Sequence, residues 1–298
     1  MPDRSSPSGA RTIMQRYGLF PKKRWGQNFL VDRNILTKIA DSCAISADQY
    51  ILEVGPGLGG LTQELANRSQ GVLAVEVDTT LEPVLRELAA SNPGIKIIFQ
   101  DILKVEIEAE IQKAFDLPAI KPYQVCANIP YNITTPILFK LLENCPHMVS
   151  ATLMMQKEVG QRLMASPGSK DYGRLTLMAA YYADIEHIMD VSRQCFYPRP
   201  EVDSLVLRII PQHPQKVPVH NEQAFKGFIR AAFQKRRKTI LNITSDFFTL
   251  DKYESEKKLQ ALGLQPNLRP ENLSLEDVAR LINAFAPLAD GYASENSC

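Results

Sequence analysis

Short apolar runs alternate with segments of helical spacing along the first two thirds of the chain. The runs at 50–54, 71–77, 95–100, 123–127 and 150–155 predict strands. Apolar residues recur every three or four positions at 58–68, 80–90 and 136–143, which predicts helices. Two later runs, 185–191 and 202–210, are typical of a hairpin-like pair of strands. Strands that alternate with helices indicate βαβ units, so we expect an α/β fold with a parallel sheet covered on both faces.

The pattern changes after a proline-rich stretch at residues 211–218, which is the best candidate for a linker. Beyond it the strand signals stop, and helical spacing recurs at 222–233, 238–247, 254–262 and 275–285. Residues 1–20 are rich in Ser, Pro and Arg, which is typical of a mobile arm. The sequence therefore predicts a basic flexible arm over residues 1–25, an α/β domain over 26–211 and a small helical domain over 212–298.

Composition narrows the classes of protein. The chain has 298 residues, is 45% hydrophobic and 22% charged, and so can build a core and is not disordered overall. Its five cysteines are scattered without metal-ligand spacing, so we expect no metal, no disulfide framework and a reducing, cytoplasmic compartment. No apolar stretch reaches the 18 residues that suggest a membrane span. The net charge is only +1, but basic residues gather within residues 1–33 and at 235–238, and local clusters matter most to a polyanionic partner.

Glycine or acidic residues lie at the ends of three successive predicted strands. Gly55 and Gly57 follow the first strand, where glycine lets the backbone turn sharply and approach a ligand closely. Glu76 closes the second strand, 21 residues after Gly55, and an acidic residue there suits a ribose diol. Asp101 follows the third strand, where a carboxylate can accept a hydrogen bond from an adenine amine. Pro56 has no N–H to offer a pyrophosphate, so a phosphate-free nucleoside such as S-adenosylmethionine fits better than NAD, the second candidate.

The tetrapeptide Asn128-Ile129-Pro130-Tyr131 closes a fourth strand at the same predicted edge. These are ordinary turn and core residues, and spacing alone does not separate that interpretation from a catalytic one. The chemistry favours function. An adenine amine is a weak nucleophile, and the Asn128 side-chain carbonyl with a nearby backbone carbonyl would orient its N–H bonds, while Tyr131 stacks on the base. The residues Thr134-Thr135-Pro136 predict a helix N-cap immediately afterwards.

A second aromatic lies in the proline-braced stretch 196–204. Phe196 is placed to clamp the other face of a base, although a buried core aromatic is an equally ordinary role for it. A base held between two aromatics must be out of its stack, which means flipped or single-stranded.

With these motifs together, the chain resembles the ribosomal RNA adenine N6,N6-dimethyltransferases, specifically the small-subunit (16S) KsgA/RsmA type. The matching stretches occur in order over nearly the full length, at 26–30, 53–62, 76–78, 100–101, 128–131, 196–204 and 233–239. The resemblance implies a Rossmann-like class I methyltransferase domain with a helical C-terminal domain. It also implies S-adenosylmethionine as cofactor and dimethylation of two adjacent adenines near the 3′ end of 16S rRNA in the maturing 30S subunit.

The resemblance also assigns roles to residues of this chain. The implied cofactor residues are Asn28, Leu30, Gly55, Gly57, Glu76, Asp101 and Asn128. Asn128 would position the target amine, and Tyr131 and Phe196 would stack on the base.

Basic residues are the candidates for contact with RNA, and they are Lys22, Lys23, Arg24, Lys235, Arg236, Arg237 and Lys238. Four consecutive helical residues sweep nearly a full turn, so the second cluster cannot share one outward face. We expect a monomer that binds 16S rRNA in the pre-30S subunit. The alternatives are a 23S rRNA methyltransferase, a DNA adenine methylase, and an assembly or transcription factor that kept the fold without the activity.

Overall fold

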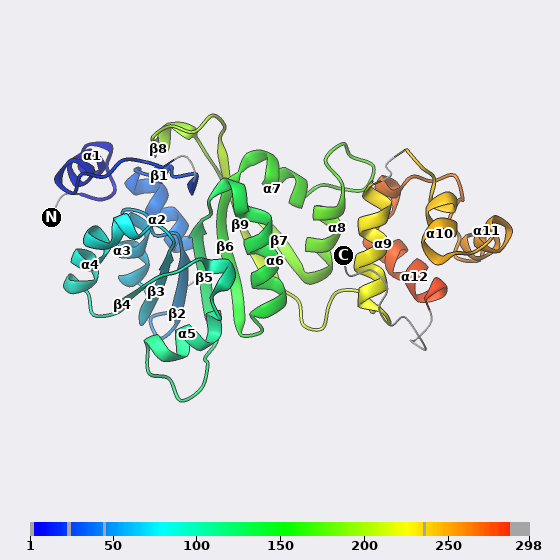
Figure 1. Cartoon of the computed structure of the whole chain (residues 1–298), viewed down its shortest axis with the longest axis horizontal. Helices are drawn as coiled ribbons and strands as arrows, with labels where there is room; N and C mark the ends of the chain where they lie inside the picture. Colours follow the sequence, from blue (N-terminus) through cyan, green and yellow to red (C-terminus); the bar gives the residue numbers. More distant parts are fainter. Residues whose placement is uncertain (1–2, 23–24, 44–45, 235–236, 287–298) are drawn as a thin grey trace. The chain divides into compact units, whose positions relative to one another are not determined.

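The computed structural model describes residues 3–22, 25–43, 46–234 and 237–286, which divide into two compact units (Figure 1). The first unit consists of the described residues up to Gly160 together with Asp184–Pro211. The second consists of Gln161–Ala183 and the described residues from Gln212 onward. The chain thus leaves the first unit at Gln161, returns at Asp184 to complete the sheet, and leaves again after Pro211.

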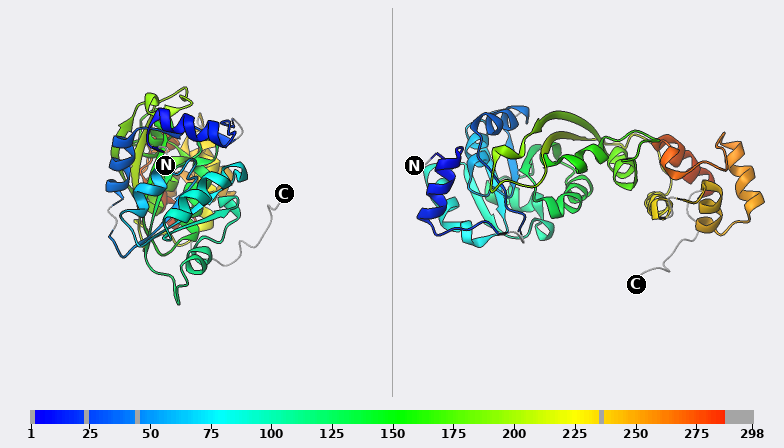
Figure 2. Two further views of the ribbon diagram at one scale, coloured as in Figure 1. Left: turned by 90° about the vertical axis from the view of Figure 1, so that its left-hand side faces the viewer. Right: turned by 90° about the horizontal axis from the view of Figure 1, so that it is seen from above.

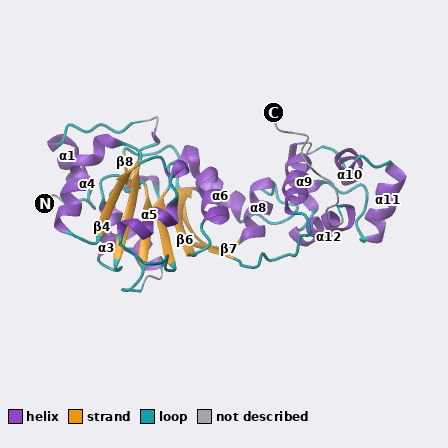
Figure 3. Ribbon diagram, turned by 60° about the horizontal axis from the view of Figure 1, so that its bottom comes forward, coloured by secondary structure: helices purple, strands orange, loops and turns teal. Residues whose placement is uncertain are grey.

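A seven-stranded sheet forms the centre of the first unit, with its strands side by side in Figure 3. The strands are β2 (Tyr50–Val54), β3 (Gly71–Glu76), β4 (Ile95–Phe99), β5 (Tyr123–Asn128), β6 (Met148–Gln156), β7 (Ala183–Val191) and β9 (Ser204–Pro211). Their order across the sheet is β4-β3-β2-β5-β6-β9-β7. Strands β2 to β6 run parallel, and β9 is antiparallel to β6. The five predicted parallel strands and the predicted closing pair therefore all belong to one sheet.

Helices cover both faces of this sheet (Figure 2). They are α2 (Arg33–Ser42), α3 (Gly60–Ala66), α4 (Glu82–Ser91), α5 (Ile107–Ala114), α6 (Thr134–Asn144) and α7 (Lys157–Leu163). Leu36 and Ile39 of α2 and Leu65 of α3 share one buried cluster with Ile51 and Val72 of the sheet. Burial on both faces explains why the central strands β2, β3 and β5 are nearly continuous apolar runs, whereas the edge strands β4 and β7 keep partly exposed positions.

The end of β5 leads into α6 through a different local structure from the predicted cap. A short 3-10 turn, η4 (Tyr131–Ile133), precedes α6, and the helix begins at Thr134, with no side chain capping its first turn. The Thr134 hydroxyl instead donates to the carbonyl of Pro130, at 3.4 Å. The prediction of an N-cap just before Pro136 was wrong because the 3-10 turn already directs the chain into the helix.

The second unit is helical. It contains α8 (Arg174–Tyr182), α9 (Glu222–Gln234), α10 (Ile240–Phe248), α11 (Lys252–Ala261), the 3-10 turn η6 (Pro270–Asn272) and α12 (Leu275–Phe285). Aromatic rings fill its core: Phe228 of α9 stacks on Phe248 of α10, with ring centroids 6.1 Å apart. Tyr181 of α8 packs on Phe225 of α9 at 4.6 Å, and the Tyr172 hydroxyl donates to the Leu273 carbonyl at 2.7 Å.

These contacts change the predicted boundary between the domains. Residues 161–183 were included in the predicted α/β domain, but Tyr172 and Tyr181 tie them to the helices of the second unit. Sequence order alone could not reveal this, because the partners of the segment lie more than 40 residues away. Residue 211 is still the point where the sheet ends and the second unit resumes.

The predicted flexible arm is also different in the structure. Residues Pro7–Arg16 form a helix, α1, capped by the Ser6 hydroxyl, which accepts a hydrogen bond from the Gly9 amide at 3.1 Å. Ala10, Ile13 and Met14 of α1 are buried in a cluster of the first unit. A short ribbon follows, in which β1 (Phe29–Leu30) pairs antiparallel with β8 (Phe196–Tyr197).

Candidate functional site: a pocket at the carboxyl edge of the sheet

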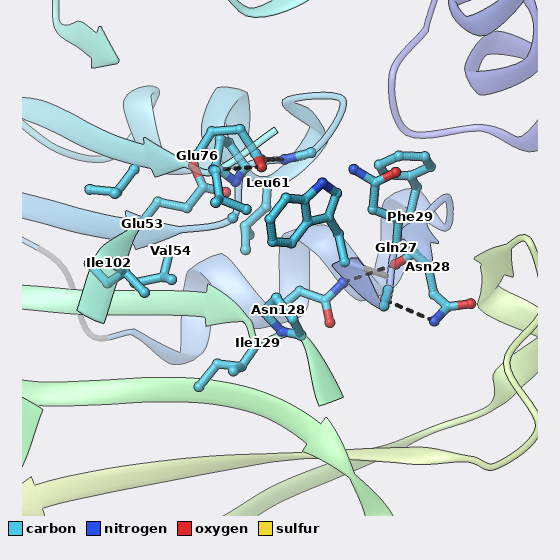
Figure 4. Close-up of a pocket in the computed structure, with 18 of the residues that line it drawn as sticks. Gln27, Asn28, Phe29, Glu53, Val54, Leu61, Glu76, Ile102, Asn128 and Ile129 are labelled. Carbon is cyan, nitrogen blue, oxygen red and sulfur yellow. Dashed lines mark hydrogen bonds between the residues drawn. The ribbon is translucent and has the colours of Figure 1, made fainter. Parts of the chain in front are cut away.

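A pocket of about 230 Å³ opens at the carboxyl ends of β2, β3, β4 and β5 (Figure 4). Leu36 of α2 and five stretches of chain line it, and the stretches lie within 25–30, 53–61, 75–77, 100–103 and 128–133. Every residue that the sequence predicted to bind the cofactor lies on this lining, namely Asn28, Leu30, Gly55, Gly57, Glu76, Asp101 and Asn128. Parallel strands in the order found here bring these separate stretches to one edge, where ligands of open α/β sheets bind.

The glycine turn after β2 forms one wall. Gly55 and Gly57 have φ values of 70° and 57°, in the left-handed region that disfavours residues with a Cβ. A Cβ on Gly57 would also lie 2.9 Å from Cδ1 of Phe29, which packs directly on the turn. The amide of Gly55 donates to the Val75 carbonyl at 2.9 Å, which fixes the turn to the neighbouring strand. Glycine is therefore required here both by backbone conformation and by space.

Glu76 is held at the end of β3 by backbone amides. One carboxylate oxygen accepts from the amides of Val77 and Asp78, both at 2.9 Å, and the other accepts from the amide of Gly57 at 3.3 Å. Burial raises the pKa of this carboxyl, and the amide donors oppose the rise. Since a carboxylate offers about four acceptor positions, these three bonds leave room for a hydroxyl donor from a ligand.

Asp101 follows β4 and is the N-cap residue of a short 3-10 turn, η3 (Ile102–Lys104). One of its carboxylate oxygens accepts from the amide of Leu103 at 3.0 Å, so the side chain caps the short turn. Asp101 is half-buried and lines the pocket beside Ile102. The sequence placed this carboxylate correctly at the edge, and its position is fixed by the cap.

The side chain of Asn128 is oriented by the opposite wall (Figure 4). Its amide nitrogen donates to the backbone carbonyl of Asn28, at 3.2 Å, across 100 residues of sequence. The Asn28 side chain in turn donates to the carbonyl of Gly26 at 3.1 Å. Because the nitrogen of Asn128 is engaged, its side-chain oxygen is the end left to accept a hydrogen bond from a ligand.

Tyr131 is held through its hydroxyl. The phenol oxygen lies 2.7 Å from Oγ of Ser204, at the start of β9. Burial raises the pKa of Tyr131, and the contact with Ser204 partly offsets this. The ring is half-buried and lines the pocket, so the structure brings Tyr131 together with Asn128 as the sequence predicted.

Phe196 is not among the described residues that line the pocket. It is 4% exposed and lies in the core cluster with Leu30, Leu36 and Ile39. Its backbone pairs with Leu30 in the ribbon of β1 and β8. The structure thus places Phe196 behind the pocket wall, in the core role that the sequence also allowed, because apolar residues of β1 and α2 cover its ring.

The predicted RNA-binding lysines and arginines have mixed environments. Lys22 is tied to the protein, since its ammonium group donates to the Asp78 carboxylate at 2.7 Å. Arg237 is exposed, and Lys238 forms a solvent-exposed ion pair with Asp246 at 3.1 Å, a weak type of contact. The remaining predicted residues, Lys23, Arg24, Lys235 and Arg236, lie outside the described residues.

Glu53 and Trp25 line the pocket but were not predicted as site residues. Glu53 is 1% exposed, and one of its carboxylate oxygens has no hydrogen-bond partner within the described part of the chain. Burial, with Glu76 nearby, raises the pKa of Glu53 to about 8. The sequence did contain a signal for Glu53, because a carboxyl group within the apolar run of β2 is unusual. Trp25 gave no such signal, because a lone aromatic ahead of a strand is not distinctive.

Within residues 3–22, 25–43, 46–234 and 237–286, no helix combines the length and apolar character needed to cross a bilayer. The same residues contain no group of three or more His, Cys, Asp or Glu side chains arranged to hold a metal ion.

Proteins of known family match this chain over most of its length. The sequence profile of the ribosomal RNA adenine dimethylases matches residues 20–287. A protein of Geobacillus thermodenitrificans named ribosomal RNA small subunit methyltransferase A is 42% identical over 289 residues, which is 96% of this chain and 98% of the relative. A protein of the same name from Bacillus cytotoxicus is also 42% identical, over 96% of this chain and 99% of the relative.

Solved structures agree. A dimethyladenosine transferase from Plasmodium falciparum superimposes with a TM-score of 0.70 and 25% identity, over 85% of this chain and 95% of that one. The 23S rRNA methyltransferase ErmE superimposes with a TM-score of 0.66 and 28% identity, over 87% and 99% of the two chains. The fold is that of a Rossmann-like methyltransferase with a helical C-terminal part, and the sequence match extends through both units. The chain belongs to the family of ribosomal RNA adenine dimethylases, enzymes that use S-adenosylmethionine.

Proposed function

We propose that this protein dimethylates the N6 amines of two adjacent adenines near the 3′ end of 16S rRNA, in the maturing 30S subunit. The choice of the small subunit is supported by relatives named small subunit methyltransferase, which are 42% identical over 96% of the chain. The 23S enzyme ErmE is 28% identical. In this proposal the protein acts in the cytoplasm as a monomer, needs no metal, and contributes to ribosome biogenesis.

The pocket fits S-adenosylmethionine. Gly55 and Gly57 place backbone without a Cβ on one wall of the pocket, where Pro56 and Leu58 of the same turn complete the lining. Glu76 retains acceptor capacity for a ribose hydroxyl, and Asp101 offers a carboxylate to an adenine amine. The unpartnered oxygen of Glu53, buried beside the turn, suits the charged amino-acid end of the cofactor.

One observation carries the proposed chemistry: the carboxamide of Asn128 is fixed by the Asn28 carbonyl, with its oxygen left to accept. When bound, S-adenosylmethionine supplies a methyl group activated by the sulfonium. The Asn128 oxygen accepts an N–H of the adenine amine and turns its lone pair toward that methyl. Alignment then carries most of the rate, because an oriented bimolecular reaction gains several kcal/mol from proximity.

Aromatic contact holds the base in this proposal. Tyr131, fixed through Ser204, offers a ring face at the pocket mouth, and stacking of a base on an aromatic is worth roughly 1–3 kcal/mol. A stacking role for Phe196 requires its ring to leave the core cluster that now covers it. Lys22, with its ammonium group on Asp78, supports the segment before the pocket more directly than it supports RNA contact.

Two exposed basic residues of the second unit, Arg237 and Lys238, are assigned to RNA phosphates. The Lys238 pair with Asp246 is exposed on both sides, so exchanging it for a phosphate costs little. Phosphate contacts of this kind make RNA binding weaken as salt is raised.

The decisive experiment is methylation with labelled S-adenosylmethionine of 30S subunits that lack dimethyladenine, with 50S subunits and naked DNA as parallel substrates. We expect label in 30S subunits alone, at the N6 position of adenines near the 3′ end of 16S rRNA. Label in 50S subunits would point to a 23S enzyme. Binding to 30S subunits without any label would instead support an assembly factor without activity, and the proposed function would be wrong.

A further inference from the structure

The segment before α1 carries a buried charge that no contact with the pocket explains. Arg4 is 5% exposed, although charged side chains are rarely buried without partners. One guanidinium nitrogen donates to the backbone carbonyl of Leu58 at 2.6 Å, and the other to the carbonyl of Val84 at 3.4 Å. Burying a guanidinium is costly unless its donors are satisfied, so this placement needs a structural reason.

Leu58 belongs to the glycine turn of the pocket. Leu58 is one of the lining residues, and its carbonyl is flanked by Gly57 and Gly59, both in the left-handed region at φ values of 57° and 82°. The amide of Gly59 donates to the carbonyl of Pro56 at 2.9 Å, which closes the turn. The Leu58 carbonyl is oriented toward Arg4 instead, and that bond joins the outer side of the turn to the N-terminal segment.

The backbone of Arg4 presses on the same turn. A Cβ on Gly60, the first residue of α3, would lie 3.2 Å from the Arg4 carbonyl oxygen, and a Cβ on Gly59 would lie 3.6 Å from its guanidinium. Arg4 therefore bonds to Leu58 and lies close to the two residues that follow, Gly59 in the turn and Gly60 at the start of α3. Through Val84 it also joins the turn to the first part of α4, which packs behind it.

Helix α1 fixes Arg4 in this position. Ile13 and Met14 are buried in a cluster that also contains Leu58 and Phe29, the ring that covers Gly57. The Tyr17 hydroxyl donates to the Glu87 carboxylate of α4, and Arg16 lies 3.6 Å from the same carboxylate. The chain preceding α1 folds back tightly on the helix, as the position of Gly9 shows: a Cβ there would lie 1.7 Å from the Asp3 carbonyl oxygen.

We propose that Arg4 is a positioning residue for cofactor binding, which holds the glycine turn through the Leu58 carbonyl while α1 fastens it to α4. Among the described residues the lining of the pocket begins at Trp25, so Arg4 acts only through the turn. The inference rests on S-adenosylmethionine binding in this pocket, which is part of the proposed function. It gives the segment before residue 20 a defined task in cofactor binding.

The test compares Arg4→Ala with Arg86→Ala, using calorimetric titration with S-adenosylmethionine alone, steady-state kinetics on 30S subunits, and thermal unfolding. Arg86 is a matched control, because it is an exposed arginine on α4 that pairs only with Glu82 of the same helix among the described residues. For Arg4→Ala we expect the Kd and KM for S-adenosylmethionine to rise about tenfold, the loss typical of a charged hydrogen bond, with kcat nearly unchanged. The Arg86→Ala values should stay at those of the unmodified protein.

A purely structural role would lower the unfolding temperature without this split between KM and kcat. Added methylguanidinium should restore part of the cofactor affinity of Arg4→Ala by occupying the vacated site, and should leave Arg86→Ala unchanged. If Arg4→Ala does not fold, Arg4→Lys, which keeps one charged donor, should fold and show a smaller rise in Kd. An unchanged Kd in whichever variant folds would overturn the proposal. Cofactor binding without methylation of 30S by the unmodified protein would instead refute the proposed function and leave this test intact.

Discussion

Replacing Asn128 with alanine separates alignment of the target amine from binding of the cofactor. The substitution removes the side-chain oxygen proposed to orient the amine, and an oriented hydrogen bond of this kind is worth roughly 10²–10³ in kcat. It also removes the 3.2 Å bond from the Asn128 nitrogen to the Asn28 carbonyl. A neutral hydrogen bond contributes about 1 kcal/mol, so the Kd for S-adenosylmethionine should rise no more than about fivefold.

The assay is single-turnover methylation of 30S subunits with calorimetry of cofactor binding on the same preparations. Asn144→Ala serves as the control, because Asn144 is an exposed asparagine at the end of α6. Asn128→Asp adds a sharper comparison. It keeps an acceptor oxygen for the amine but sets a carboxylate against the Asn28 carbonyl, so it should weaken cofactor binding more than alanine does. A rise in Kd for Asn128→Ala as large as its fall in turnover would refute the reasoning.

Three further substitutions test the walls of the pocket. Gly57→Ala should lose at least about 1–2 kcal/mol of unfolding free energy and most of its cofactor affinity, whereas Gly18→Ala, also at positive φ but with no atom within 4 Å of its new Cβ, should lose only the backbone part. Urea unfolding and calorimetry measure both. Glu53→Gln tests the pKa that burial raises to about 8. The folded protein holds the Glu53 proton more tightly than the unfolded chain does. The contribution of Glu53 to the free energy of unfolding therefore falls as pH rises from 5 to 8, by up to about 3 kcal/mol. The Gln variant should lack that part of the fall in urea titrations, and identical pH profiles would contradict the assignment. Tyr131→Phe keeps the ring but loses the contact with Ser204, so kcat/KM on 30S subunits should fall less than about tenfold and far less than for Tyr131→Ala.

Strands β2, β3 and β5 of the first unit were predictable because they are buried along almost their whole length. β2, for example, is the five-residue run Tyr50–Val54 in both the prediction and the structure. The start of the next helix was less predictable. The predicted helix begins at 58, whereas α3 begins at Gly60, because Gly59 at a φ of 82° still belongs to the turn. Once the strands were predicted correctly, the grouping of the polar residues that follow them could also be predicted, since parallel strands bring these residues to one edge of the sheet.

Long-range contacts account for what the sequence did not show. The helix α1 lies in a stretch whose Ser, Pro and Arg content is typical of a mobile arm, and its buried residues Ala10, Ile13 and Met14 pack it against Leu58 and α4. Phe196 is an aromatic residue in a proline-rich stretch, which suggested stacking on a base. Its pairing with Leu30 in the ribbon instead directs its ring into the core cluster. Neither outcome is encoded by local spacing, because each depends on a partner distant in the chain.

A long-range contact of the same kind connects cofactor binding with orientation of the target amine in the proposed reaction. The Asn128 carboxamide has a donor end bound to the wall that carries Asn28, and an acceptor end left for the target amine. Placement of that wall for the cofactor therefore also sets the direction of the acceptor. A glutamine at this position would keep both functional groups, but its extra methylene would move them about 1.5 Å along the chain. It could then satisfy the Asn28 carbonyl or the amine, but not both without moving a wall. In this proposal the short side chain of asparagine meets both demands with one geometry: a bond to the Asn28 carbonyl and an acceptor for the target amine.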